Sequence, residues 1–254
     1  MAVFGVGFDG IDPSALADRG ILLANTPDVL SDDVAATAVL LWLACCRRLL
    51  PADEHARRGR WAARNRFPLT RSPLDSRVGI LGFGRIGEVA ARLLAPFRAE
   101  IHYQSRHRKD VPYRYHDSPA SLAAAVGALI VITPGGPGTH HLVDATVIGA
   151  LGPDGILVNV ARGSVVDQAA LIEALRTGEL KMAGLDVIDG EPVVPEELCA
   201  ITDRTVMSPH FASTTTETIA AMGYPVVRNL LAWAADEPVE PPVPESRRLL
   251  DRTR

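Results

Sequence analysis

The sequence predicts an α/β fold, a doubly wound parallel sheet of the Rossmann type, and three observations lead to that class. Short apolar runs alternate with helical segments from residue 77 to about residue 208, the order expected of parallel strands with crossover helices. The runs are continuously apolar, as in strands buried on both faces. A glycine-rich turn joins the first run to a helix. The 254 residues have room for one large domain or two small ones.

The glycine turn is the most informative stretch of the chain. Residues 77–81 form a short apolar strand, and Gly82, Gly84 and Gly87 follow in the spacing G-x-G-x-x-G. In that motif the first glycine permits a tight turn, the second lets the backbone approach a pyrophosphate, and the third brings the helix close to the strand. Apolar residues then recur every three or four positions over 86–97, which predicts a helix whose N-terminus binds the phosphates.

Ahead of the turn the sequence predicts short elements, a long helix and a basic segment. They are strands at 3–6 and 21–24, a helix opening at Asp12-Pro13, an apolar helix at 34–49 capped by Ser31 or Asp32, and an arginine-rich arm at 51–70. The arm is either a surface connection or a dimer arm. The exposure expected for Trp61 and Phe67 favours the dimer arm.

After the turn strands and helices alternate. Strands are expected at 100–104, 113–116, 129–132, 156–160, 182–187 and 205–208, and helices at 118–126, 144–152, 168–177 and 214–236. Asp167 and Gly178 are the expected ends of the third of these helices. A capping box from Thr214 to Glu217 is expected to open the last helix, and Pro225 to kink or split it.

Composition argues against several classes of protein. The net charge of −4 gives no reason to expect nucleic acid or an anionic membrane as a partner. The longest apolar run, 34–46, is too short to span a bilayer, and no signal peptide is recognisable. Cys45, Cys46 and Cys199 form no disulfide or metal framework. A cytoplasmic protein without a metal site is therefore expected.

Three polar residues are candidates for catalysis. Arg162, Glu191 and His210 each come a few residues after the end of a predicted strand, the edge where ligands of such sheets bind. An arginine binds a carboxylate and polarises an adjacent carbonyl. A histidine donates a proton near neutral pH, and a nearby carboxylate stabilises its charged form. Each residue alone reads as an ordinary loop residue, but the three together with a nicotinamide favour reduction of a 2-oxo acid.

The cofactor preference is read at the end of the 100–104 strand, which faces the adenosine ribose. Ser105 stands there, where NAD enzymes usually carry Asp or Glu, and Arg106 and Arg108 follow. A hydroxyl and guanidinium groups bind a 2′-phosphate, whereas an acid would repel it. The segment is either a basic surface turn or a 2′-phosphate site, and the second favours NADP, with NAD as the alternative.

These motifs resemble the D-isomer-specific 2-hydroxyacid dehydrogenase family, most closely its glyoxylate/hydroxypyruvate reductase branch. The matching stretches are Leu81–Gly87, Val160–Gly163, Gly184–Val187 with Glu191-Pro192, Pro209-His210, Asn25–Leu30 and the segment around Trp233. The resemblance implies that Arg162 binds the substrate carboxylate and carbonyl, with His210 as acid/base and Glu191 as its partner. It also implies that the N–H groups of Val6 and Gly7 hold the substrate carboxylate. The implied cofactor contacts include Arg85, Ile86, Pro134, Thr139, Val160 and Asp186.

The resemblance further implies how the chain is divided. A dinucleotide-binding domain at 35–216 is inserted in a flavodoxin-like substrate domain, of which residues 1–34 and 217–254 remain. The first strands and helices of that domain are missing from this sequence, which is therefore expected to be N-terminally truncated. The family also implies a homodimer through the cofactor domain and a small-molecule substrate.

The expected function is NADP-preferring reduction of glyoxylate, hydroxypyruvate or a related 2-oxo acid to the D-2-hydroxy acid. One alternative is a non-catalytic dinucleotide-binding dimer or truncated pseudoenzyme, which the missing segment favours and the intact Arg162, Glu191 and His210 oppose. A second alternative is a formate-type dehydrogenase. Formate chemistry needs no general acid, so a histidine paired with a carboxylate favours the 2-hydroxyacid reaction.

Overall fold

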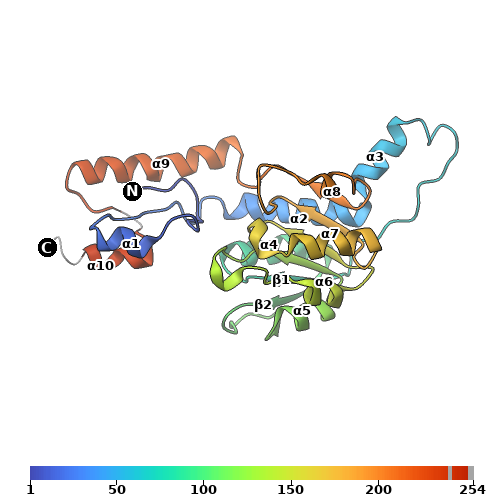
Figure 1. The fold of residues 1–254 in the computed structure, drawn as a ribbon, viewed down its shortest axis with the longest axis horizontal. Coiled ribbons are helices and arrows are strands. Elements are labelled where there is room, and N and C mark those ends of the chain that lie inside the picture. The colour runs from blue at the N-terminus through green and yellow to red at the C-terminus, as the bar shows by residue number, and fades with distance from the viewer. Residues whose placement is uncertain (240–241, 251–254) are drawn as a thin grey trace. The chain divides into compact units, whose positions relative to one another are not determined.

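The chain divides into two compact units in a computed structural model that describes residues 1–239 and 242–250 (Figure 1). The larger unit is Val34–Ala212, and the smaller combines Met1–Asp33 with the described residues from Ser213 onward. That the smaller unit is the remnant of a substrate domain stays a prediction. Of the segment predicted for it at the C-terminus, residues 240–241 and 251–254 lie outside the described residues.

The larger unit contains a seven-stranded sheet in the order β3-β2-β1-β4-β5-β6-β7, with every neighbouring pair parallel. The strands are β1 Arg77–Leu81, β2 Glu100–Gln104, β3 Arg114–His116, β4 Ala128–Val131, β5 Ile156–Asn159, β6 Met182–Leu185 and β7 Thr205–Met207. The predicted doubly wound parallel sheet is confirmed. The strand order reverses between β1 and β4, and ligands of such sheets bind beyond the strand ends at that point.

Helices cover both faces of this sheet (Figure 1). One face packs against α5 Pro119–Ala125, α6 Ala145–Leu151 and α7 Gln168–Thr177, whose apolar side chains share one buried core with the strands. The other face packs against α2 Ser31–Arg47 and α4 Arg85–Leu94. Gly184 in β6 allows α2 to approach closely, since a Cβ there would lie 2.9 Å from the Cβ of Leu41. Short helices complete the unit: α3 Leu49–Arg57, η1 Ala95–Phe97, η2 Pro137–Thr139, η3 Gly163–Val165 and α8 Glu196–Cys199.

The smaller unit is built from helices and two isolated pairings. Its helices are α1 Pro13–Asp18, α9 Thr216–Ala234, η4 Pro244–Ser246 and α10 Arg247–Leu250. The strands predicted at 3–6 and 21–24 are wrong, because only Ala2 and Ala24 pair, through a single parallel bridge. Ala24 also bridges to Pro242. One bridge leaves too few shared hydrogen bonds for a ladder, although the apolar runs suggested strands.

Several helix ends differ from the predictions. α2 begins at Ser31, three residues early, so Ser31 and Asp32 lie inside its first turn. There Asp32 favours the helix through the dipole instead of capping it. Thr215, rather than Thr214, caps α9 and accepts a hydrogen bond from the N–H of Thr218. Of the kink or split predicted at Pro225, the split is wrong: α9 continues through the proline, which removes only one intrahelical hydrogen bond.

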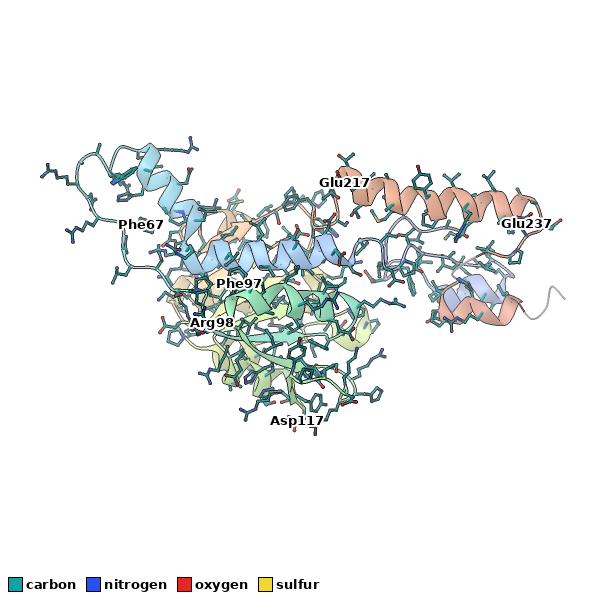
Figure 2. All side chains as sticks on the ribbon, turned by 180° about the vertical axis from the view of Figure 1, so that it is seen from behind. Phe67, Phe97, Arg98, Asp117, Glu217 and Glu237 are labelled. Atoms are coloured by element: carbon teal, nitrogen blue, oxygen red, sulfur yellow. The ribbon has the colours of Figure 1, made fainter. Side chains whose placement is uncertain are left out.

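The predicted arm is partly helical. α3 occupies its first part, and the loop that follows extends away from the sheet and carries Phe67 (Figure 2). Phe67 is half-buried, with its ring 5.4 Å from that of His55, so the full exposure expected for it is wrong. Trp61 is 77 % exposed and Leu69 99 %.

In the described part of the chain, no single helix has the length and apolar character to cross a bilayer, and α2 with α3 meets those criteria only as a pair bent by 57°.

Candidate active site

Two glycines of the turn have the backbone geometry predicted for them, and the role predicted for the third, toward a pyrophosphate, stays a prediction. Gly82 has φ +98°, and a Cβ there would lie 2.7 Å from the carbonyl oxygen of Ile132. A Cβ on Gly87 would lie 2.7 Å from the carbonyl oxygen of Gly82, so this glycine seats α4 against the end of β1. Gly84 faces open space. The backbone at Gly84 is therefore accessible to a ligand, as a pyrophosphate site requires.

The surroundings of the turn fit a dinucleotide. α4 begins at Arg85, and Gly84 before it supplies no side-chain cap, so the N–H groups of its first turn can bind an anion. In the described part of the chain, Thr133 Oγ1 is a buried side-chain oxygen with no hydrogen-bond partner. Thr133 directly contacts the turn, since its N lies 2.8 Å from where a Cβ on Gly82 would be. An unpaired hydroxyl beside an open glycine turn suits a polar ligand.

The loop after β2 holds the residues predicted to read the ribose. Ser105 follows the strand, and its Oγ donates to the carbonyl oxygen of His107 at 2.7 Å. Arg106 and Arg108 are exposed, and neither has an ion-pair partner among the described residues. No acidic side chain stands at the position of Ser105. The loop therefore offers a hydroxyl and two cations at the end of β2.

Three residues that the sequence interpretation did not use anchor this loop. The hydroxyl of Tyr103 accepts from the backbone N of Lys109 at 2.8 Å and donates to its carbonyl oxygen at 3.1 Å. The Lys109 ammonium donates to Glu88 on α4 at 2.7 Å. The lysine charge is therefore engaged by α4, unlike those of the two arginines.

His210 and Glu191 form a direct pair. Nδ1 of His210 lies 3.1 Å from Oε1 of Glu191, and the two side chains are 48 % and 34 % exposed. The two residues come from separate loops, one after β7 and one after β6. Because Nδ1 faces the carboxylate, Nε2 is the ring nitrogen left to meet a substrate.

The loop that carries His210 is fixed by Asp186, at the end of β6. The carbonyl oxygen of Asp186 accepts from the N–H of His210 at 2.8 Å. Its carboxylate is 2 % exposed and accepts from the Ser208 hydroxyl and from the N–H groups of Phe211 and Ala212. These bonds hold His210 at φ +51°, a conformation that is uncommon for residues other than glycine. The cofactor contact predicted for Asp186 stays a prediction.

Arg162 lies on the neighbouring loop, between β5 and η3. Asn159, which is 1 % exposed, donates to the carbonyl oxygen of Arg162 and accepts from the N–H of Ala161, both at 3.0 Å. Gly163 packs directly on the loop of Glu191, since a Cβ there would lie 2.0 Å from the carbonyl carbon of Ile188. The Arg162 loop therefore contacts the Glu191 loop, and the Glu191 loop contacts the His210 loop.

Other predicted site residues are placed without their ligands. Val6 and Gly7 lie in the smaller unit, in a turn held by Asn25, whose Nδ2 donates to the carbonyl oxygen of Val6 at 2.9 Å. In the larger unit, Thr139 Oγ1 donates to the carbonyl oxygen of Pro134 at 2.7 Å. The ligand contacts of these residues, and those of Arg85, Ile86 and Val160, stay predictions.

Two of the three cysteines are buried. Burial raises the pKa of the Cys46 thiol to about 11 and also raises that of Cys45, which keeps both protonated and unreactive. Within residues 1–239 and 242–250, no three His, Cys, Asp or Glu side chains are grouped to hold a metal ion.

A glycine turn shaped for a dinucleotide, in the same sheet as a carboxylate-paired histidine, defines a nicotinamide-dependent dehydrogenase. The sequence profile described as "D-isomer specific 2-hydroxyacid dehydrogenase, NAD binding domain" matches residues 39–212. The chain belongs to this family of NAD(P)-dependent oxidoreductases, as its motifs suggested.

Relatives with assigned activities cover most of the chain. It is 42 % identical over 241 residues to hydroxyphenylpyruvate reductase of Plectranthus scutellarioides, and 43 % identical over 241 residues to glyoxylate/hydroxypyruvate reductase A of Arabidopsis thaliana. Each alignment covers 94 % of this chain and 76 % of the relative. Among solved structures, the NADPH-dependent glyoxylate/hydroxypyruvate reductase of Sinorhizobium meliloti, in complex with NADP and malonate, superposes with a TM-score of 0.91 at 45 % identity. That match covers 96 % of this chain and 77 % of the other.

Proposed function

We propose that the protein reduces glyoxylate, hydroxypyruvate or a closely related 2-oxo acid to the D-2-hydroxy acid with NADPH. Its family carries out NAD(P)-dependent chemistry on 2-hydroxy and 2-oxo acids. The narrower substrate choice is supported by the reductases of glyoxylate and hydroxypyruvate among its relatives. The observation that carries the proposal is the 3.1 Å pair of His210 and Glu191 in a dinucleotide-binding fold.

Each residue of the site has a separate role in the reaction. A bound reduced nicotinamide supplies the hydride that the substrate's carbonyl carbon accepts. His210 donates a proton from Nε2 to the carbonyl oxygen, which balances the hydride and leaves a hydroxyl group. Glu191, on Nδ1, stabilises the protonated ring before that transfer. Arg162 binds the substrate carboxylate and polarises the carbonyl.

The preference for NADPH rests on the loop after β2. Ser105 supplies a hydroxyl group there, while Arg106 and Arg108 supply exposed positive charge. A 2′-phosphate gains charge-assisted hydrogen bonds from such groups. The related reductase of Sinorhizobium meliloti is described as NADPH-dependent, which supports the same preference here.

We also propose a homodimer through the larger unit. Trp61 and Leu69 lie on the loop after α3 and are 77 % and 99 % exposed. Large apolar side chains at such exposure favour a protein partner, and a second copy of the chain is the proposed one. The cytoplasmic location expected from the cysteines stays a prediction.

The proposal is tested by following NADPH oxidation with glyoxylate and with hydroxypyruvate, and in controls without a 2-oxo acid. We expect turnover with at least one 2-oxo acid. His210→Ala should lower kcat by about a hundredfold or more, because it removes the proton donor, and should leave the Kd for NADPH within about twofold, since His210 lies outside the glycine turn. NADPH binding without turnover on any 2-oxo acid would instead support the non-catalytic alternative.

A further inference from the structure

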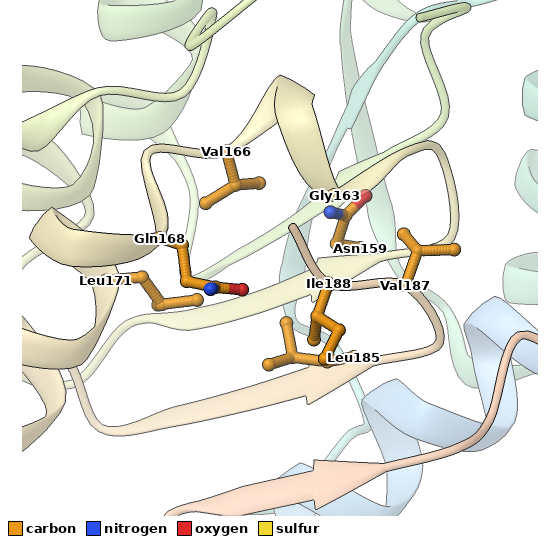
Figure 3. A pocket seen from close by; sticks show the side chains of 8 residues that line it. All are labelled: Asn159, Gly163, Val166, Gln168, Leu171, Leu185, Val187 and Ile188. Carbon is orange, nitrogen blue, oxygen red and sulfur yellow. The ribbon is translucent and has the colours of Figure 1, made fainter. Parts of the chain in front are cut away.

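The side chain of Gln168 is bonded to the backbone of the loop that carries Glu191. Its Oε1 accepts from the N–H of Asp189 at 3.0 Å, and its Nε2 lies 3.3 Å from the carbonyl oxygen of the same residue. The amide thus pairs with both polar groups of one residue, as a neighbouring strand would. Figure 3 shows Gln168 pointing from α7 toward the segment of Ile188.

Gln168 is itself held firmly. It is the first residue of α7, and Asp167 before it caps the helix by accepting from the N–H of Ala170 at 3.1 Å. Leu171, one turn further, is buried in the core. The space between Gln168 and the Ile188 segment is a cavity of only about 10 Å³ (Figure 3), enough for about one water molecule. The anchor therefore lies at a capped helix end, one turn from the buried core.

Besides the packing of Gly163 against Ile188, the Glu191 loop has few other hydrogen-bonded anchors. Residues 189–194 are exposed, and Gly190 adopts φ +77°. Within the described chain, the hydrogen bonds that join residues 189–193 to other elements are those of Gln168 and the contact of Glu191 with His210. The carboxylate of Glu191 begins only two residues after the anchored Asp189. An exposed loop keeps its side chain at hydrogen-bond distance only if its backbone is tethered.

We propose that Gln168 is a positioning residue for the reduction: by holding Asp189 it keeps Glu191 against His210. This inference rests on the proposed function of the Glu191–His210 pair. Gln168 also lies on the segment that follows Arg162 and Gly163, so one side chain fixes the spacing between the loop that binds the substrate carboxylate and the loop that supports the proton donor. Displacements of about 1 Å at such a site cost about a hundredfold in rate.

The residue type fits the role. A side-chain amide donates from its nitrogen and accepts at its oxygen, so glutamine satisfies the N–H and the carbonyl of Asp189 together. Glutamate would keep the accepting contact and lose the donating one. Alanine would lose both, but the freed groups of Asp189 are exposed and would bind water. Gln168→Ala should therefore loosen the loop without unfolding the unit.

The test compares Gln168→Ala and Gln168→Glu with a control on the same helix, Glu173→Ala. The side chain of Glu173 is exposed to solvent and pairs with Arg176. We expect Gln168→Ala to lower kcat for the 2-oxo acid by about tenfold or more, with the KM for NADPH and the Tm close to wild type. Gln168→Glu should fall between, and Glu173→Ala should match wild type.

Two further measurements separate the inference from its alternatives. In a Glu191→Gln background, adding Gln168→Ala should change kcat by less than about twofold, because the two act through one contact. Hydrogen–deuterium exchange of residues 188–195 should rise in Gln168→Ala, and this readout does not depend on turnover. A wild type that reduces no 2-oxo acid refutes the proposed function alone. Unchanged exchange, or a kcat of Gln168→Ala equal to that of the wild type, overturns the role of Gln168.

Discussion

At the scale of residues, a few side chains that are hydrogen-bonded to loop backbone define the site. Asn159 fixes the Arg162 loop, Gln168 fixes the Glu191 loop and Asp186 fixes the His210 loop. Each of these anchors stands at the end of a strand or the start of a helix. The flexible parts of the site are therefore supported by residues that the sheet and α7 hold in place.

Cofactor choice is decided at one residue. Ser105→Asp should place a carboxylate where the 2′-phosphate of NADPH would lie and beside the ribose hydroxyls of NADH. We expect the ratio of Kd values to shift toward NADH by about a hundredfold, which corresponds to about 2.7 kcal/mol. Fluorescence titration with both cofactors measures it. Ser105→Ala, which adds no charge, should change the ratio only a few-fold. A wild type that binds NADH as tightly as NADPH would refute the assignment.

At the scale of elements, β2 and β3 share a histidine pair at the edge of the sheet. His102 is buried, with Nδ1 2.9 Å from Nε2 of His116 and Nε2 3.0 Å from Glu100. Desolvation, followed by the charges of His102 and Arg114, holds the pKa of His116 below its ordinary value of 6.5, while Asp117 opposes the shift. The neutral form of His116 is therefore the one that the folded sheet favours.

This histidine pair predicts how stability depends on pH. Because the pKa of His116 is lower in the folded state, the unfolded chain binds more protons below pH 6.5. The contribution of His116 is complete above that pH and is lost as the pH falls through the folded pKa. Between pH 8 and 5, His116→Asn should thus lose less stability to thermal unfolding than the wild type. The difference in the free energy of unfolding should be less than about 1 kcal/mol. His107→Asn, a change at an exposed histidine, should behave as wild type, and equal slopes in all three would contradict the assignment.

At the scale of the whole molecule, the exposed loop after α3 is the surface proposed for dimerisation. If two copies pair through Trp61 and Leu69, replacing both with aspartate should convert a dimer into a monomer, because charges are costly in an apolar interface. Light scattering after size exclusion measures the mass directly. Tyr224→Asp, at a residue of the smaller unit that is 79 % exposed, is the matched control and should remain dimeric. A monomeric wild type would rule out the proposed dimer.

Local sequence patterns determined the sheet, the glycine turn and the three candidate catalytic residues. Buried parallel strands are continuous apolar runs, and the glycine spacing follows from one tight turn, so both are readable from neighbouring residues. Arg162, Glu191 and His210 could be selected from the sequence because each follows a parallel strand. Parallel strands end at the same edge of a sheet, so residues that follow them lie at that edge. The caps at Asp144 and Asp167 were likewise local.

The tertiary structure decided which residues support that site. Gln168 and Asp189 are 21 positions apart, and Asp186 and Phe211 are 25 apart, so their contacts leave no periodic trace in the sequence. A polar residue ending an apolar strand, as at Asn159, was a readable signal of a buried anchor, whereas Gln168 at a helix start carried none. Long-range packing also decided the bridges at Ala2 and Ala24 and the start of α2. Such packing overrides local propensity wherever a segment's hydrogen bonds go to distant parts of the chain.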